Sequence, residues 1–475
     1  MTQAPVPPPK TPKPPPVMID LPRDHAVIYG TPEGVAAARD AGPLTLGPGP
    51  HLFIDDYLVE SAQGVARVVN QPQRDLPGPI IDGPTDRAFQ PFFTVLQDPQ
   101  TGTFRTWYGA ARDDKSTDGQ LLGYMESPDG IHWQRPMRAL ERPEELQFGS
   151  DVLDAGPDCP DPAQRYTWCW CARDGAHIST SADGLNFRPL SPKAFVPHGH
   201  DVCGLWWDPI RSRYMLTVGD HYFLPHMTER RRTASHGFSE DLLHWTDKQI
   251  VVVSDNRYDK DILQFYAMNG YIARGDLVIG LVKNLHDDWK APGAPEGAYG
   301  VGSTSLAWTR DGQTWVRDRE VFFGPDPVAG AWDHAHAWID KQLLLGDEVR
   351  LYYCGYKWGH KHNRFEERQI GLVRMQRDRY VARQAGGQAG VLRTPPVVLS
   401  GKGLTINAKV DGELAVRLLD AQDRPLAGCD WTAIQGDRVD HPVTWDGKLG
   451  ASAGRPVRLE WRLRDAQLFG FDLLA

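Results

Sequence analysis

The chain has 475 residues, with 52 Lys and Arg against 61 Asp and Glu, and therefore a formal net charge of −9. Its hydrophobic fraction of 41% and charged fraction of 24% are typical of globular chains and exclude wholesale disorder and a membrane protein. No block of Lys and Arg stands out, which argues against nucleic acid as a partner. Counts of 16 Trp, 15 Tyr, 16 Phe, 47 Gly and 39 Pro favour an all-β fold with flat aromatic surfaces that suit sugars. We therefore expect a carbohydrate ligand and leave the oligomeric state open.

Residues 1–45 form a Pro-rich tail and a lead-in segment. The stretch Met1 to Val17 has no continuous apolar run that could serve as the core of a signal peptide, so we expect a cytoplasmic protein. The six cysteines show no CxxC pair and are interpreted as buried thiols. Cys169 and Cys171 alternate along one predicted strand, and a redox pair is the alternative for these two.

A seven-residue pattern of hydroxyl, any residue, Asp, Gly or Leu, two residues and an aromatic occurs four times. Its Asp residues, at positions 129, 183, 241 and 311, are 54, 58 and 70 positions apart. Asp-Gly makes a tight turn between strands, and the Ser or Thr and Asp side chains bond to the backbone of the turn. We interpret the pattern as a structural turn and not as a catalytic motif. The copies are Ser127–Trp133, Ser181–Phe187, Ser239–Trp245 and Thr309–Trp315.

Alternating short strands surround each turn, and a fifth unit without the turn follows at Trp332–Arg383. Units of this size with four short strands are typical of the blades of a β-propeller. We therefore predict a five-bladed β-propeller over residues 46–385, which would be the catalytic domain. The strand His51–Val59 would close the ring by pairing with the last blade. After a Gly-rich hinge, short alternating strands predict a small C-terminal β-sandwich over residues 391–475.

This order of domains and the repeated turns, best seen in Ser239-Glu-Asp-Leu-Leu-His-Trp245, resemble glycoside hydrolase families 32 and 43. The segments Leu52–Glu60 and Gly454–Leu463 look like those of bacterial proteins usually labelled glycosyl-hydrolase-like. The resemblance implies a propeller with a β-sandwich behind it and a hydrolase acting on glycosidic bonds. The Asn-Asp-Pro-Asn-Gly segment that marks the nucleophile strand of family 32 does not occur, so no fructosidase mechanism is carried over.

The innermost strands of a propeller begin near one axis, so residues at those starts converge although they are distant in sequence. Glycoside hydrolysis needs a protonated carboxylic acid and an ionised carboxylate. The expected catalytic residues are Asp86, Asp151, Asp201 and Asp333. The expected substrate-binding residues are Arg87, His200, Tyr222, Gln264, Tyr266, His334 and His336. For any single Asp, the alternative is a cap that bonds to backbone amides.

The histidines near the predicted blade starts leave several chemistries open. They occur in Pro197–Asp201, Asp220–Tyr222, Asp333–His336 and Gly359–His362. They could bind sugar hydroxyls, hold a divalent metal with Asp, act with Tyr as acid and base of a polysaccharide lyase, or have no role. No cofactor is predicted otherwise. We expect a glycoside hydrolase acting on an oligo- or polysaccharide; a lyase or a non-catalytic glycan-binding propeller are the alternatives.

Overall fold

The computed structural model describes residues 17–18, 32–116, 119–141, 146, 148–197, 200–223, 231–254, 259, 263–445, 449 and 454–475. Strands dominate, and the helices are short: α1 (Pro32–Asp40), α2 (Gly83–Asp86), α3 (Arg364–Glu367) and the 3-10 turns η2 (Asp56–Leu58) and η3 (Pro162–Gln164). The all-β prediction is confirmed. In the described part of the chain, no helix combines the length and the apolar character that crossing a membrane would require.

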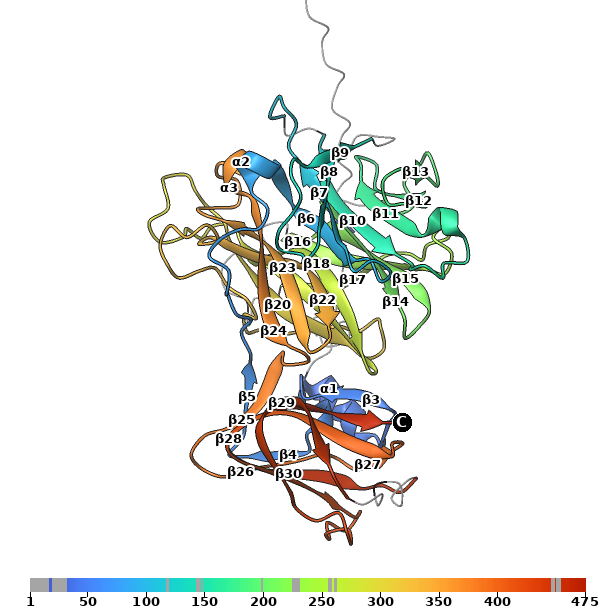
Figure 1. Ribbon diagram of the computed structural model, residues 1–475, viewed down its shortest axis with the longest axis vertical. Coiled ribbons are helices and arrows are strands. Elements are labelled where there is room, and N and C mark those ends of the chain that lie inside the picture. Colours follow the sequence, from blue (N-terminus) through green and yellow to red (C-terminus); the bar gives the residue numbers. More distant parts are fainter. Residues whose placement is uncertain are drawn as a thin grey trace, which may run out of the picture.

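The upper part of the molecule in Figure 1 is built from successive antiparallel units, the last two of which share one sheet through a parallel bridge of Gly302 with His336. The first three are β6 (Ala88–Gln97), β7 (Phe104–Ala110), β8 (Leu121–Ser127) and β9 (Arg138–Leu140); β10 (Phe148–Asp154), β11 (Tyr166–Cys171), β12 (Ala176–Ser181) and β13 (Arg188–Pro189); and β14 (His200–Asp208), β15 (Arg213–Phe223), β16 (Arg231–Ser239) and β17 (Gln249–Val252). The short strand β1 (Val17–Met18) runs parallel to β15. The last two units are β18 (Leu263–Arg274), β19 (Leu277–His286), β20 (Val301–Thr309) and β21 (Val316–Arg317); and β22 (His336–Leu345), β23 (Glu348–Tyr356) and β24 (Gln369–Gln376).

The first strands of these units surround one axis. Each contacts the next in the order β6, β10, β14, β18, β22, and β22 contacts β6 again. This circular order is that of a β-propeller, which removes long exposed sheet edges. The outer edge of the fifth unit is covered by the segment that precedes the first unit, through bridges of Gln73 with Arg374 and of Ile81 with Ile370.

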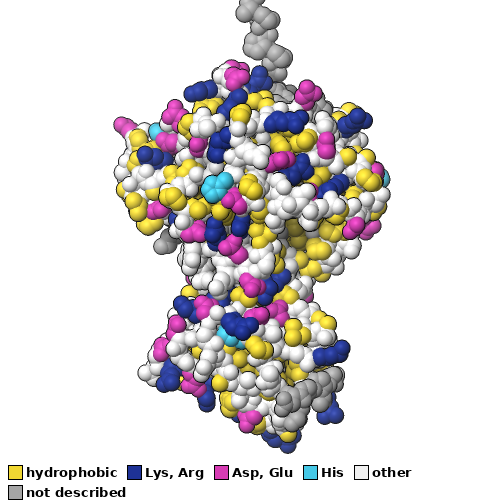
Figure 2. All heavy atoms as spheres, in the orientation of Figure 1, with side chains coloured by type: hydrophobic (Ala, Val, Ile, Leu, Met, Phe, Trp, Pro, Cys, Tyr) yellow, Lys and Arg dark blue, Asp and Glu magenta, His cyan; other side chains and the backbone are white. Residues whose placement is uncertain are grey.

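The lower part of Figure 1 is a small β module made from both ends of the described chain. Its strands are β2 (Leu44–Leu46), β3 (Gly49–Leu52), β4 (Ser61–Gln63), β5 (Ala66–Val69), β25 (Val381–Ala385), β26 (Gly390–Arg393), β27 (Val397–Leu399), β28 (Gly403–Leu419), β29 (Thr432–Val443) and β30 (Arg458–Leu474). Figure 2 shows a waist between the two parts, with charges of both signs interspersed on each.

The prediction that His51–Val59 closes the propeller is wrong. His51 pairs with Phe471 on β30, and Phe53 packs edge-on against Trp461 with ring centroids 5.2 Å apart. Residues 44–69 and 381–385 therefore belong to the C-terminal module, which differs from the predicted boundaries of 46 and 385. The alternation of apolar residues indicates a strand, but it does not say which sheet supplies the partner.

The repeated motif forms the structural turn that the sequence predicts. In the second unit, Ser181 Oγ donates to Asp183 Oδ1 at 2.8 Å, and the same oxygen accepts from the amides of Leu185 and Asn186 at 2.8 and 2.9 Å. These bonds hold the pKa of Asp183 below its usual range although partial burial acts against them. The other three turns repeat the Ser or Thr to Asp bond.

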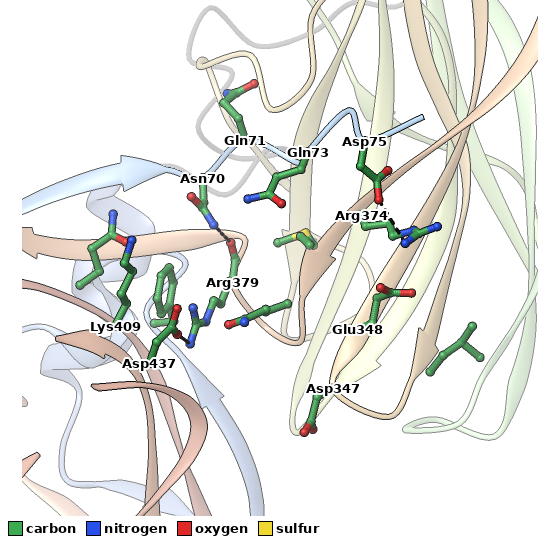
Figure 3. A pocket seen from close by; sticks show the side chains of 15 residues that line it. Asn70, Gln71, Gln73, Asp75, Asp347, Glu348, Arg374, Arg379, Lys409 and Asp437 are labelled. Carbon is green, nitrogen blue, oxygen red and sulfur yellow. Dashed lines mark hydrogen bonds and ion pairs between the residues drawn. The ribbon is translucent and has the colours of Figure 1, made fainter. Parts of the chain in front are cut away.

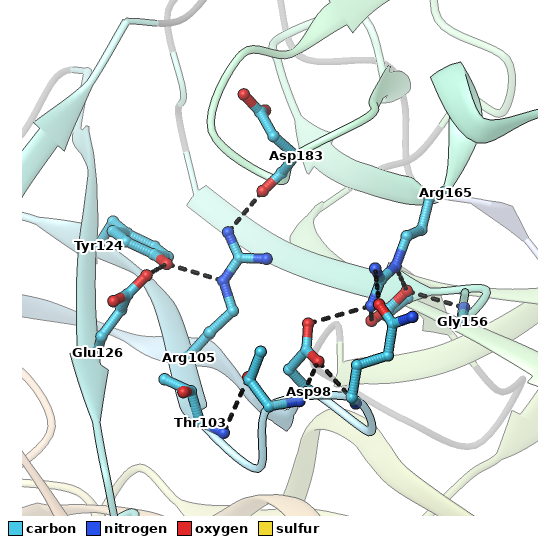
Figure 4. A network of polar contacts seen from close by, with 11 residues as sticks. Asp98, Thr103, Arg105, Tyr124, Glu126, Gly156, Arg165 and Asp183 are labelled. Carbon is cyan, nitrogen blue, oxygen red and sulfur yellow. Dashed lines mark hydrogen bonds and ion pairs between the residues drawn. The ribbon is translucent and has the colours of Figure 1, made fainter.

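The turns also connect neighbouring units. Figure 4 shows Arg105 on β7 donating to the carbonyl oxygen of Asp183 at 2.5 Å and to the hydroxyl of Tyr124 at 2.7 Å. Arg350 on β23 donates in the same way to the carbonyl of Asp129, which joins the fifth unit to the first. Arg213 donates to the carbonyl of Gly312 at 2.9 Å and joins the third unit to the fourth. The motif is thus an attachment point for the preceding blade.

Candidate functional site

Two buried ion pairs occupy the propeller axis. Lys341 on β22 pairs with Asp151 Oδ1, which also accepts from Thr94 Oγ1 at 2.7 Å, and Asp151 Oδ2 accepts from the amide of Leu205 at 3.1 Å. Lys283 on β19 pairs with Asp340. The Asp151 contacts alone join β6, β10, β14 and β22 at the centre of the ring. Both oxygens of this predicted catalytic carboxylate are engaged in holding the inner strands together.

The second pair extends the same network. Asp340 Oδ2 accepts from the amide of Phe93 at 2.8 Å, and its Oδ1 accepts from Asn269 Nδ2 at 2.9 Å. Lys283 also donates to the carbonyl of Pro91 at 2.6 Å. Every inner strand of the propeller therefore has a residue in this axial network.

Asp86 and Asp333 lie in two other networks. Asp86 is 1% exposed and accepts two hydrogen bonds from the Arg135 guanidinium, from Nε to Oδ1 at 2.8 Å and from Nη2 to Oδ2 at 2.7 Å. Asp333 Oδ2 accepts from Arg74 Nε at 3.0 Å and from the hydroxyl of Tyr353 at 2.9 Å. The structure thus differs from the expectation that Asp86, Asp151 and Asp333 converge, because each is bound by its own cation.

Three predicted residues of the third unit have side chains outside the described part of the structure. The backbone of His200 opens β14 and pairs with Gly219, Asp201 follows it, and Tyr222 on β15 pairs with Arg231. Arg87 ends α2 in a left-handed conformation, and its Nη1 lies 2.9 Å from Oδ1 of the exposed Asp113.

A compact group of side chains lies where the inner strands of the fourth and fifth units begin. We call it the funnel cluster: Arg232 (β16), Tyr266 (β18), His336 and Trp338 (β22), Tyr356 (β23), His360 in the loop that follows, and Arg368 before β24. Tyr266 stacks on Trp338 with ring centroids 4.9 Å apart. His360 lies edge-on to Tyr266 at 4.9 Å, and His336 lies 5.5 Å from His360. Three units of the propeller contribute to this one cluster.

The two histidines of the cluster are buried without full hydrogen bonding. His336 is 0% exposed, and neither of its ring nitrogens has a hydrogen-bond partner among the described residues. His360 Nδ1 lacks one as well. Burial, reinforced by the positive charge of Arg368, holds the pKa of both rings well below the usual range. Both are therefore neutral near pH 7, and each nitrogen can donate to or accept from a ligand hydroxyl.

Exposed aromatic rings lie beside the cluster. Trp289 is 40% exposed and stacks on His286, and Tyr299 is 50% exposed. The carbonyl of Tyr299 accepts from the amide of His360 at 2.9 Å, so this loop is attached to the cluster. Such rings can stack on the apolar face of a sugar at the entrance to the site.

Two carboxylates lie close to the cluster. Glu367 precedes Arg368; its Oε1 is 3.3 Å from His362 Nδ1, and its buried Oε2 has no hydrogen-bond partner among the described residues. Asp287 accepts from Gln264 Nε2, and Gln264 Oε1 accepts from the amide of Arg232 at 3.3 Å.

Of the predicted binding residues, the structure brings together Tyr266 and His336, with Gln264 adjacent. His334 is not part of the cluster, because its ring nitrogens face the carbonyls of Asp326 and Pro292 at 2.7 and 3.0 Å. His360 and Arg368 were not predicted as site residues. The two histidines of the Gly359–His362 segment pointed to His360 as a site residue, whereas an isolated Arg before a strand does not stand out in the sequence.

Among the described residues, no group of three or more His, Cys, Asp or Glu that could hold a metal occurs.

A groove of about 560 Å³ separates the propeller from the C-terminal module (Figure 3). Asp75 and Arg374 pair across 3.1 Å on the propeller side, and Arg379 pairs with Asp437 at 2.6 Å near the module. Arg374 Nε has no hydrogen-bond partner among the described residues, but the two carboxylates of these pairs are engaged. We place the candidate site at the funnel cluster, where four side chains have nitrogens without a partner among the described residues.

No family model matches the chain, and no curated protein does. Among solved structures, it is similar to an N-acetylgalactosamine deacetylase from F. plautii in complex with blood group B trisaccharide, with 14% identity, a TM-score of 0.43 and coverage of 67% of this chain and 97% of that one. It is also similar to a GH32 β-fructofuranosidase of Bombyx mori, with 11% identity, a TM-score of 0.38 and coverage of 90% and 93%. A fructofuranosidase from Schwanniomyces occidentalis matches with 12% identity, a TM-score of 0.39 and coverage of 84% and 98%. At these identities and TM-scores the similarity does not assign an activity, which has to be argued from the geometry of this chain.

Proposed function

We propose that this protein is a carbohydrate-active enzyme, a glycosidase that binds its sugar at the funnel cluster. The observation that carries the proposal is the set of buried ring nitrogens on His336 and His360 that have no hydrogen-bond partner among the described residues. Buried polar atoms in proteins are nearly always hydrogen-bonded, so such a set marks a place where a polar ligand completes the bonding. The stacked Tyr266 and Trp338 and the exposed Trp289 supply aromatic surface for a sugar ring.

The catalytic carboxylates of this proposal are Glu367 and Asp201. Glu367 precedes Arg368 of the cluster in the chain and has one oxygen without a protein partner among the described residues. Asp201 belongs to the opening of β14, one of the five inner strands, and its position in the chain supports its role. A hydrolase needs one carboxyl as proton donor and the other as base or nucleophile. Asp86, Asp151 and Asp333 are assigned to the fold, because Arg135, Lys341 and Arg74 bind them.

A non-catalytic glycan-binding propeller is the second candidate. The observation in its favour is that three of the four acids expected at the axis are neutralised by cations of the chain. A binding module requires the neutral histidines and the aromatic surface but no pair of free carboxylates.

Binding to a panel of oligosaccharides, followed by assays for release of reducing sugar, tests the proposal. His360→Ala should weaken binding of any glycan that is found by at least tenfold, whereas His244→Ala, an exposed residue of an outer turn, should not change it. Cleavage by the wild type supports the enzyme, and binding without cleavage favours the module. Equal binding by wild type and His360→Ala would contradict the assignment of the site.

A further inference from the structure

Arg368 is a buried cation without a counter-ion. It is 4% exposed, its Nη1 donates to the carbonyl of Phe89 at 2.7 Å and its Nη2 to the carbonyl of His360 at 3.1 Å. Its Nε has no hydrogen-bond partner, and no ion pair to it occurs within the described part of the chain. The guanidinium carbon lies 5.3 Å from the ring centre of Phe89 and 5.0 Å from that of Tyr356. The group is held in place but its charge is not neutralised.

Arg232 is a second cation of the funnel cluster without a carboxylate partner in the described part of the chain, and it is partly buried. Its guanidinium carbon lies 4.9 Å from the ring centre of Tyr266, and its buried Nη1 has no partner among the described residues. Its amide is fixed by Gln264 Oε1. No carboxylate among the described residues forms an ion pair with Arg232. Asp287 instead accepts a hydrogen bond from the side chain of Gln264.

Both guanidinium groups lie on rings that pack against His360. Tyr266, under Arg232, and Tyr356, beside Arg368, both pack against His360, with ring centroids 4.9 and 6.2 Å from it. The positive charges of Arg368 and Arg232 both add to the burial that lowers the pKa of His360. A positive potential therefore fills the space around this ring.

Several other guanidinium groups of the chain are matched with carboxylates. Examples are Arg317 with Asp259 at 2.6 Å, Arg379 with Asp437 at 2.6 Å and Arg383 with Asp56 at 2.8 Å. An uncompensated buried charge is strongly destabilising, and it is retained where a ligand supplies the opposite charge. Arg105, which also lacks a carboxylate, bonds to the hydroxyl of Tyr124 and the carbonyl of Asp183. Arg232 and Arg368 each keep a nitrogen without a hydrogen-bond partner among the described residues, and they point to an anion.

We propose that the sugar bound in the funnel carries an anionic group, the carboxylate of a uronate or a sulfate ester, which is placed between Arg232 and Arg368. This inference rests on the proposed function, because it names the class of sugar that the same site takes. A planar guanidinium can give two parallel hydrogen bonds to either oxyanion. His336 and His360 then contact the neutral hydroxyl groups of the same ring.

The test compares sugars that differ only at one carbon. Glucuronate and galacturonate are titrated against glucose and galactose, with galactose 6-sulfate as the sulfated probe, using the full chain and saturation-transfer NMR. The account expects a Kd for one acidic sugar at least ten times lower than for its neutral counterpart, with the preference weakened at high salt. Comparing the Kd of the uronates with that of galactose 6-sulfate shows whether the site prefers a carboxylate or a sulfate ester.

Variants assign the preference to the cluster. Arg232→Gln should remove the preference, so that the acidic sugar binds no more tightly than its neutral counterpart. Arg424→Gln, on an exposed turn of the C-terminal module, should leave both affinities unchanged. Arg368→Lys, which keeps a cation but loses the two-pronged geometry, should reduce the preference, and melting curves show that each variant is folded. If neutral sugars bind as well as acidic ones and His360→Ala removes that binding, the anionic inference is overturned and the proposed function stands. If none of these sugars nor any oligosaccharide of the panel binds, both are overturned.

Discussion

Lys341 on the inner strand of the fifth unit forms an ion pair with Asp151 on the inner strand of the second unit. The two residues are 190 positions apart and meet at the propeller axis, where Asp151 also receives hydrogen bonds from Thr94 and Leu205. This contact makes Asp151 a structural anchor of the ring.

Asp151→Ala should therefore destabilise the protein by about 3 to 5 kcal/mol, because it leaves Lys341 buried without its partner. The free energy of unfolding in urea measures this loss. The double variant Asp151→Ala/Lys341→Met should recover part of the stability, since it removes the unpaired charge. A stability of Asp151→Ala equal to that of the wild type would contradict the anchor.

Asp183→Ala should destabilise the protein by about 1 kcal/mol, because the Asx-type bonds to the amides of Leu185 and Asn186 are lost. Asp440→Ala, on the C-terminal module, removes only a surface pair with Arg438 and serves as the control. Thermal melting measures both. Unchanged stability of Asp183→Ala with reduced sugar binding would show that the turn has a function beyond the fold.

Mild acid should destabilise the protein. Burial lowers the pKa of His236 to about 3, whereas an unfolded His has a pKa of about 6.5. Between these values the unfolded chain binds a proton that the folded chain excludes, so stability present above pH 6.5 is lost as the pH falls toward 3. One such His costs about 2 kcal/mol between pH 7 and pH 5, and His336 and His360 act in the same direction.

Urea unfolding at pH 7 and at pH 5 measures this dependence, and His236→Asn should reduce it. Asp129 and Asp183, whose pKa values lie below the usual range, lose their contribution only below about pH 4 and do not interfere. Burial raises the pKa of Asp151 and Asp472, which act in the opposite direction, so the comparison with His236→Asn isolates the histidine. The same pH dependence in wild type and His236→Asn would contradict a neutral His236 in the folded state.

The repeated turns made the propeller predictable from sequence, because the Ser-x-Asp pattern is local and each copy forms its own hydrogen bonds. The partner of His51–Val59 was not predictable in this way, since a strand pairs with a distant sheet through burial of side chains such as Phe53 against Trp461. Because Tyr266 and His336 lie near the starts of two inner strands, the sequence placed them in one site, and in the structure both rings pack against Trp338 and His360.

Position alone did not distinguish acids that anchor the fold from acids that are free. Asp86, Asp151 and Asp333 stand at or near strand starts, and it is Arg135, Lys341 and Arg74, distant in sequence, that bind them. Arg232 and Arg368 became candidates only through the structure, in which no described carboxylate binds them.

The most direct test of the account is the turnover of Glu367→Gln and Asp333→Asn on a glycan that the wild type cleaves, measured with each variant shown to be folded. The account predicts that Glu367→Gln lowers kcat by about 10² or more, because a general acid or base contributes that factor. Asp333→Asn should retain kcat within a few-fold. A fully active Glu367→Gln together with an inactive but folded Asp333→Asn would contradict the assignment of the chemistry to the funnel cluster.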